Sequence, residues 1–355
     1  MRLTDMTPMI DRFSRPISYL RLSVTDRCNF RCVYCMPAEG IKTIPKADIL
    51  TFEEIARVVE VGVSLGLTKL RLTGGEPTVR ADLPVLVRML REIRGLGEIS
   101  MTTNAARLAE LAGPLRSAGL DRVNISLDTL DRDRAAAIAR RDILPEVMAG
   151  IEAAIAAGLT PLKFNAVVMR GHNDQDLCDL AAFAHERGAQ MRFIEYMPMG
   201  DARLDIDDSS TRATMTAAEM RVRLAERFDL VPEPSPTADG KAVPSTGDAT
   251  PPADLHDPAR GWYCRRTGTR VGFITSMSDH FCDTCNRMRL TAEGALRPCL
   301  HQDAEVDVRS LLRTGGSDAR IADAYRQAAA LKWEGHRMTQ LVPLYSRREM
   351  VAIGG

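Results

Sequence analysis

The sequence predicts an α/β fold in which short β-strands alternate with amphipathic helices. Two observations carry this prediction: strand-like and helix-like runs follow each other at steps of roughly 30 residues, and the strand-like runs alternate apolar with polar side chains. A chain of 355 residues also has room for one barrel of about 250 residues and a smaller module. Six strand–helix units favour an incomplete (β/α) barrel or a doubly wound sheet.

The expected elements lie in the first two thirds of the chain. The strands are expected at residues 19–24, 69–73, 99–103, 123–127, 162–168 and 192–196. The helices are expected at residues 52–65, 82–93, 108–118, 144–157 and 176–187. Thr51 stands directly before the first helix, where its hydroxyl can serve as an N-cap.

The remaining sequence predicts four segments. Residues 1–15 form an N-terminal arm, and residues 16–232 form the partial barrel. Residues 233–260 are rich in Pro, Ala, Asp, Thr and Ser and are expected to be a linker or insertion. Residues 261–355 form a C-terminal module, with strands expected at 269–275 and 286–291 and helices at 308–313 and 320–331.

Composition excludes a general electrostatic attraction to polyanions. Lys and Arg total 47, as do Asp and Glu, so the net charge is zero. We therefore expect no nucleic-acid or membrane partner, and any polyanionic ligand must be bound by locally concentrated cations. No apolar run is long enough to span a bilayer, and residues 1–16 lack a signal-peptide core, so we expect a cytoplasmic protein.

Cys28, Cys32 and Cys35 form a Cx3Cx2C run that can hold one metal centre. Three thiolates leave one coordination position open. A structural zinc site requires four ligands, whereas tight cysteine runs commonly hold iron–sulfur clusters. The run therefore favours an iron–sulfur cluster over zinc or a redox disulfide.

A second set, Cys282, Cys285 and Cys299, repeats this composition near the C-terminus. His280 and His301 flank it and could supply a fourth zinc ligand, so the residues alone leave zinc and a second open cluster as alternatives. The two other cysteines, at positions 178 and 264, are expected to be ordinary buried or partly exposed thiols.

Strand alternation predicts a ring of polar groups inside the barrel. Helices cover the outer face of such a sheet, so the apolar side chains face outward and the polar ones face the lumen. The inward residues are Arg21, Lys69, Arg71, Lys163 and Arg192, joined by Asn124, Ser126, Asp128 and Asn165. Such a lumen suits an anionic, hydroxyl-rich ligand such as a nucleotide. The alternative is that these cations pair with acids at the rim, and a register slip of one residue would reverse every face.

Two further motifs stand near expected strand ends. Gly74 and Gly75 follow the second strand, where they permit close backbone approach, and Glu76 supplies an acceptor. Arg287 and Arg289 stand two apart, so on a strand they share one face and can bind phosphate or a purine.

The motifs together resemble the radical S-adenosylmethionine (SAM) superfamily, through the Cx3Cx2C run and the Gly-Gly-Glu-Pro turn. More narrowly, the runs at residues 20–26, 72–80, 124–130 and 281–290 and the terminal Gly-Gly are similar to the GTP 3′,8-cyclase family, also called molybdenum cofactor biosynthesis protein A. The resemblance covers residues 13–355. It implies an incomplete (β/α)6 TIM-like barrel of the radical SAM type with a smaller α+β module that carries a second iron–sulfur cluster.

The resemblance implies two 4Fe-4S clusters, SAM as cosubstrate and GTP as substrate. Reductive cleavage of SAM would give a 5′-deoxyadenosyl radical that removes the ribose 3′ hydrogen, after which C3′ attacks guanine C8. An external one-electron reductant and a downstream cyclic pyranopterin monophosphate synthase are implied partners, and a homodimer is left open. Another radical SAM enzyme with an auxiliary cluster, acting on a peptide or other small molecule, is the alternative.

The same resemblance assigns roles to individual residues. Cys28, Cys32 and Cys35 would hold the SAM-binding cluster, and Cys282, Cys285 and Cys299 the substrate-binding one. SAM contacts would be Tyr34, Gly74, Gly75, Glu76, Ser126 and Met197. GTP contacts would be Arg21, Arg71, Thr102, Lys163, Arg287, Met288 and Arg289. The catalytic set would be Arg21, Arg287, Arg289 and the tail residues Gly354 and Gly355.

Overall fold

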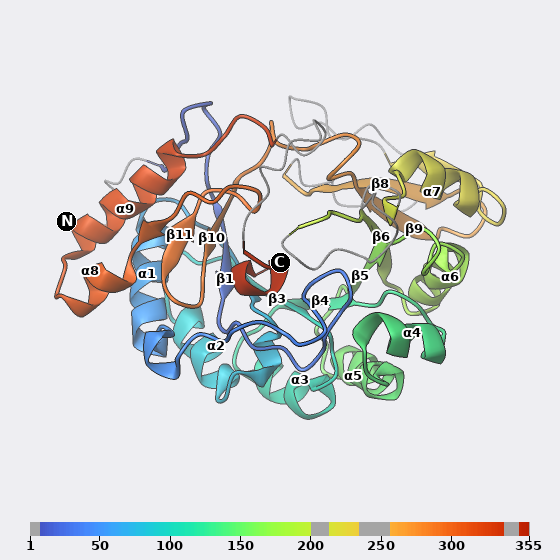
Figure 1. Ribbon diagram of the computed structural model, residues 1–355, viewed down its shortest axis with the longest axis horizontal. Helices are drawn as coiled ribbons and strands as arrows, with labels where there is room; N and C mark the ends of the chain where they lie inside the picture. Colours follow the sequence, from blue (N-terminus) through green and yellow to red (C-terminus); the bar gives the residue numbers. More distant parts are fainter. Residues whose placement is uncertain (1–7, 200–212, 234–255, 337–347, 355) are drawn as a thin grey trace.

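A computed structural model describes residues 8–199, 213–233, 256–336 and 348–354. Its centre is a run of parallel strands in sequence order (Figure 1). They are β1 (Tyr19–Ser23), β2 (Lys69–Thr73), β3 (Glu98–Thr103), β4 (Arg122–Ser126), β5 (Lys163–Val168) and β6 (Gln190–Glu195). The predicted strands are confirmed to within two residues. The order never reverses among them, which distinguishes this fold from a doubly wound sheet and makes it a partial barrel.

Helices cover the outside of this curved sheet, as Figure 1 shows. The predicted ones are α1 (Phe52–Ser64), α2 (Leu83–Arg91), α3 (Leu108–Ser117), α5 (Leu144–Ala156) and α6 (Leu177–Glu186). The short helices α4 (Arg132–Ala139) and α7 (Ala217–Leu224) were not predicted. At the start of α1, the Thr51 side chain and Glu54 form a reciprocal capping box, which confirms the expected N-cap.

The C-terminal residues extend both edges of the sheet. On one side β9 (Arg270–Ile274) pairs parallel with β6, followed by antiparallel β8 (Ala259–Cys264) and β7 (Leu230–Pro232). On the other side β10 (Arg287–Leu290) pairs parallel with β1 and continues into antiparallel β11 (Ala295–Arg297) and β12 (Val306–Asp307). The result is one open sheet of 12 strands among the described residues.

Shorter elements complete the described chain. They are α8 (Arg309–Arg313), α9 (Asp318–Ala330) and the 3-10 turns η2 (Lys46–Asp48), η3 (Pro77–Val79) and η6 (Met350–Ile353). Residues 234–255, most of the expected linker, lie outside the described residues, but the strands on either side of them pair as a hairpin, with Pro232 opposite Trp262. The division into four segments stays a prediction. Within the described part, no helix has the length and apolar character needed to cross a membrane.

The predicted register of the inner strands is confirmed. Leu20, Leu22, Leu70 and Leu72 are at most 1% exposed and belong to the core between sheet and helices. Their polar neighbours therefore face the lumen, because successive side chains of a strand point to opposite faces.

We predict that Gly150→Ala destabilises the protein. Gly150 lies in α5 where that helix packs on α3, and a Cβ there would stand 2.0 Å from the carbonyl oxygen of Ala105. The overlap should lower the free energy of unfolding by about 1–3 kcal/mol, measured by urea denaturation. The control is Gly113→Ala in α3, where the added Cβ meets no atom within 4 Å outside its chain neighbours and its own helix backbone. Because Pro114 follows and disfavours the helical conformation of a preceding residue with a Cβ, the gain in helix propensity is offset, and the free energy of unfolding should change by less than about 1 kcal/mol. Equal effects of the two changes would contradict this packing.

Candidate functional site

Both cysteine sets line one cavity of about 390 Å³ inside the partial barrel. Cys28, Cys32 and Cys35 belong to the loop after β1, and Cys282 and Cys285 to the loop before β10, with Cys299 following β11. Because β1 and β10 are parallel neighbours, with Tyr19 opposite Arg287, a loop after one strand and a loop before the other lie at opposite ends of the pair. A strand of five residues spans about 16 Å, so the cavity runs between the two sets along the strands.

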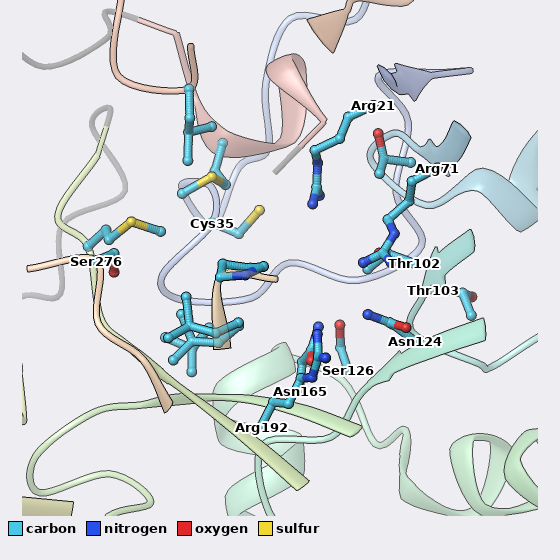
Figure 2. Close-up of a pocket in the computed structure, with 18 of the residues that line it drawn as sticks. Arg21, Cys35, Arg71, Thr102, Thr103, Asn124, Ser126, Asn165, Arg192 and Ser276 are labelled. Atoms are coloured by element: carbon cyan, nitrogen blue, oxygen red, sulfur yellow. The ribbon is translucent and has the colours of Figure 1, made fainter. Parts of the chain in front are cut away.

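Cations from neighbouring strands line the wall between the cysteine sets. Arg21 stands opposite Arg71 on β2 and opposite Arg289 on β10. Figure 2 shows Arg21 and Arg71 on one side of the cavity and Arg192, with Asn124, Ser126 and Asn165, on the other. Lys69, Arg122 and Arg287 also line it. The predicted ring of polar side chains is therefore present.

These guanidiniums are held in an environment that favours an anion. Burial is the main cause that lowers the pKa of Arg21 to about 10, with Arg71 and Arg287 adding repulsion against the opposing effect of Tyr19. Burial, together with Arg21, also lowers the pKa of Arg289. Desolvated, mutually repelling cations gain most from a multiply charged anionic ligand.

Several buried polar atoms of the cavity wall have no hydrogen-bond partner among the described residues. They are Tyr19 Oη, Thr102 Oγ1, Asn124 Nδ2 and Asn165 Oδ1. Buried polar groups are nearly always hydrogen-bonded, so such atoms indicate where a polar ligand binds. Donors and acceptors beside cations fit a nucleotide.

Lys163 and Arg192 converge on Asp257, a residue that the sequence analysis did not select. Asp257 Oδ2 accepts from Arg192 Nη2 at 2.5 Å and from Lys163 Nζ at 3.4 Å. Burial is the largest influence on the pKa of Asp257 and would raise it, but Arg192 and Lys163 together bring it down to about 2. Burial, aided by Arg192, lowers the pKa of Lys163 to about 8. Asp257 and Arg192 line the cavity, whereas Lys163 is not among the lining residues and contacts the wall through Asp257.

The glycine turn holds the first cysteine loop against the end of β2. Gly75 N donates to Thr25 O, and Glu76 N donates to Arg27 O, both at 2.8 Å. A Cβ on Gly75 would lie 2.4 Å from the Arg27 carbonyl oxygen. Glycine is therefore required at this position because the turn packs closely against the chain's own cysteine loop.

Glu76 is buried and ties this turn to β3. Its Oε1 accepts from the Thr103 hydroxyl at 2.7 Å, and its Oε2 accepts from Asn104 N at 2.7 Å. Burial raises the pKa of Glu76 in spite of these bonds. The carboxylate thus links the glycine turn to the end of β3. Like Glu76, the other residues expected to contact SAM line the cavity: Tyr34, Gly74, Gly75, Ser126 and Met197.

Tyr34 and Asp128 connect the first cysteine loop with β4. Tyr34 Oη donates to Asp128 Oδ2 at 2.9 Å, and Val167 N donates to Asp128 Oδ1 at 2.9 Å. Burial raises the pKa of Asp128 to about 6. Burial also raises the pKa of the Cys28 thiol to about 11 and that of Cys35 to about 12. These thiols bind a metal only as thiolates, so metal binding must displace their protons.

The second cysteine set lies among cations and histidines. Burial would raise the pKa of Cys285, but Arg287 and then Lys332 outweigh it and lower the value to about 6. The His301 and His280 rings lie 4.6 and 5.1 Å from the His336 ring. No three His, Cys, Asp or Glu side chains in the described ranges are grouped closely enough to hold a single metal ion.

The C-terminal tail enters the cation wall. Arg21 Nη2 donates to the Gly354 carbonyl at 3.3 Å, and Arg289 Nη1 donates to the same oxygen at 2.5 Å. Gly354 has a φ of +69°, and a Cβ there would stand 2.6 Å from Thr73 Oγ1. Figure 1 shows the C-terminal end of the described chain inside the curve of the open sheet. Gly355 lies outside the described residues.

The Met288 side chain faces the core. It stands between Arg287 and Arg289 on β10, opposite Leu20 of β1, and its side chain is 0% exposed in the hydrophobic core. Strand alternation turns it away from the cavity that its two neighbours line. The Met288 side chain therefore does not line the cavity, and the expected contact of this residue with GTP stays a prediction.

Comparison with known proteins gives the class and then the family. Residues 22–184 match the Radical SAM superfamily, and residues 189–338 match the family described as Molybdenum Cofactor Synthesis C. The structure of Streptococcus suis SuiB bound to S-adenosylmethionine has a similar fold, with a TM-score of 0.54 over 96% of this chain and 78% of that chain, at 14% identity. The site and fold thus define a radical SAM protein.

Relatives with assigned activities narrow this class. The GTP 3′,8-cyclase of Moorella thermoacetica is 46% identical over 93% of this chain and 95% of its own length. That of Pelotomaculum thermopropionicum is 43% identical over 98% of this chain and 100% of its own length. The chain belongs to the GTP 3′,8-cyclase family.

We predict that Gly75→Ala displaces the first cysteine loop. The added Cβ overlaps the Arg27 carbonyl, so the iron bound after anaerobic reconstitution should fall and the free energy of unfolding should decrease by about 1–3 kcal/mol. Iron assay and denaturation of the same preparations measure both effects, with Gly113→Ala as the control. Full iron loading in the Gly75 variant would contradict the packing described above.

Proposed function

We propose that this protein is a radical SAM GTP 3′,8-cyclase, a lyase that converts GTP to (8S)-3′,8-cyclo-7,8-dihydroguanosine 5′-triphosphate in the first step of molybdenum cofactor biosynthesis. The observation that carries the proposal is the single cavity that joins two three-cysteine sets through a wall of buried guanidiniums. Membership of the family supports the same reaction. A peptide-modifying radical enzyme is less well supported, because this concentration of buried cations suits a triphosphate better than a peptide.

Cys28, Cys32 and Cys35 are proposed to hold a 4Fe-4S cluster with one open iron. When bound, such a cluster supplies the electron that cleaves SAM to a 5′-deoxyadenosyl radical. The chain's own contribution is to seat the cosubstrate. Ser126, Tyr34 and the Gly74–Glu76 turn would position SAM at this end of the cavity, and the turn's packing keeps the cysteine loop in place.

The cation wall is proposed to bind the triphosphate. Arg21, Arg71, Arg287 and Arg289 line the cavity, and Thr102 Oγ1 is buried without a described partner. Guanidiniums bind phosphate oxygens in bidentate fashion, which would orient the ribose relative to SAM. Lys163 and Arg192 would join them if the triphosphate competes with Asp257 for these cations.

A second 4Fe-4S cluster on Cys282, Cys285 and Cys299 is proposed at the opposite end, where its open iron would meet the guanine base. A set of three thiols and membership of the GTP 3′,8-cyclase family support a cluster over a single zinc ion. The reaction also needs an external one-electron reductant, and a cyclic pyranopterin monophosphate synthase would consume its product.

Iron content tests the two-cluster proposal. Anaerobic reconstitution should give about eight irons per chain, because two cubanes hold four each. Cys282→Ser should lower the count to about four while the first cluster still cleaves SAM. Cys178→Ser, a cysteine outside both sets, should leave the count unchanged. Four irons together with one zinc in the wild type would refute the second cluster.

Arg289→Ala should separate SAM cleavage from GTP turnover. Loss of one buried guanidinium should reduce formation of the cyclised nucleotide by about a hundredfold, while 5′-deoxyadenosine still forms under dithionite. The adjacent Met288→Leu, on the opposite face of β10, should retain turnover. Cys28→Ser should abolish both products, as measured by mass analysis. Loss of SAM cleavage in the Arg289 variant would overturn the assignment of this residue to the substrate.

A further inference from the structure

Lys332 is a buried residue beside the second cysteine set that also lines the cavity, and the proposed function assigns no role to its side chain. It follows α9 and is 3% exposed. Its Nζ donates to Arg287 O at 2.8 Å and to Pro298 O at 2.7 Å. Arg287 comes two residues after Cys285, and Pro298 directly precedes Cys299. One ammonium therefore ties together the two segments that carry these cysteines.

Arg15 of the N-terminal arm holds the third cysteine of the set in a similar way. Its Nη1 donates to the carbonyl oxygens of Cys282 and Glu334, each at 2.7 Å, and its Nη2 donates to Trp333 O at 2.5 Å. The backbone on either side of the cysteines is thus anchored by two buried cations, and the segment that carries Lys332 is anchored by Arg15.

The two cations differ in how their charge is balanced. Arg15 pairs with the buried carboxylate of Asp11 at 2.6 Å. Lys332 forms no ion pair with a carboxylate in the described part of the chain, and its hydrogen-bond partners are neutral carbonyls. A buried ammonium is costly unless an anion lies nearby. The groups that feel its charge are the thiols of Cys282 and Cys285.

We infer that Lys332 is both the clamp and the counter-ion of the second cysteine site: it fixes the segments that carry Cys285 and Cys299 and balances the negative charge of a thiolate-ligated iron–sulfur cluster. This inference rests on the second cluster of the proposed function. Groups just outside a metal's ligands set ligand geometry and redox potential. Because Lys332 also holds the carbonyl of Arg287, it positions the start of β10, whose side chains line the substrate cavity.

The reduction potential of the second cluster tests the charge. A full-length chain with Cys28→Ser, Cys32→Ser and Cys35→Ser keeps only the second set and is titrated under EPR. In this background, Lys332→Met should stabilise the oxidised cluster at least tenfold, a fall of 59 mV for one electron, because removal of a positive charge disfavours reduction. Lys332→Arg keeps the charge and should shift the potential by much less. Lys46→Met, at an exposed lysine of η2, is the matched control and should cause no shift.

The measured potential and iron content support or contradict the role of Lys332 as follows. An unchanged potential in the Lys332→Met chain, or equal shifts in the Met and Arg variants, would overturn the counter-ion role. If Lys332→Met prevents the cluster from assembling, iron content replaces the potential: retention by the Arg variant supports the inference, and loss in both variants contradicts it. A wild-type chain that holds only about four irons would refute the second cluster itself, and this inference with it; a normal wild-type count with no effect of Lys332→Met refutes the inference alone.

Discussion

Buried positive charge in the lumen of the partial barrel is the constraint to which the rest of the site conforms. Strands covered by helices must turn their apolar side chains outward, so whatever polar groups they carry are confined to the interior. Here that interior contains guanidiniums whose pKa values are lowered by burial. These cations have local partners: Asp257 forms ion pairs with Lys163 and Arg192, and the Gly354 carbonyl accepts hydrogen bonds from Arg21 and Arg289. One carboxylate and one neutral carbonyl carry much less negative charge than a triphosphate.

Strand polarity explains why two cysteine sets more than 200 residues apart can serve one cavity. β1 leads into the first set and β10 follows the second, and the two strands pair in parallel. The sets are therefore separated by about one strand length, with the residues of β1, β2 and β10 between them. A ligand in this space would meet a cysteine set at each end and cations along its length. That arrangement favours a substrate with a base, a sugar and a charged chain.

Local signals in the sequence predicted most of this fold. Alternation at period two located the six inner strands and their faces, and cysteine spacing identified the two sets of thiols that line the cavity. The same alternation places the Met288 side chain on the face of β10 opposite those of Arg287 and Arg289. α4 was missed because its apolar face consists mainly of alanine, which gives a weak periodic signal. Asp257 lies in a stretch without periodicity, and the roles of Arg15 and Lys332 depend on bonds to distant backbone carbonyls. A backbone carbonyl can accept such a bond whatever side chain its residue carries, so the sequence contains no pattern that predicts it.

The tail shows why backbone atoms matter at this site. Arg21 and Arg289 are two of the residues proposed to bind GTP, and both donate to the Gly354 carbonyl. A side chain at this position would overlap Thr73 and would have to adopt a left-handed backbone conformation. Glycine alone brings a carbonyl dipole to two guanidiniums without filling the space beside them. The tail carbonyl and the proposed substrate therefore meet the same two positive charges, and the tail fixes the orientation of both guanidiniums.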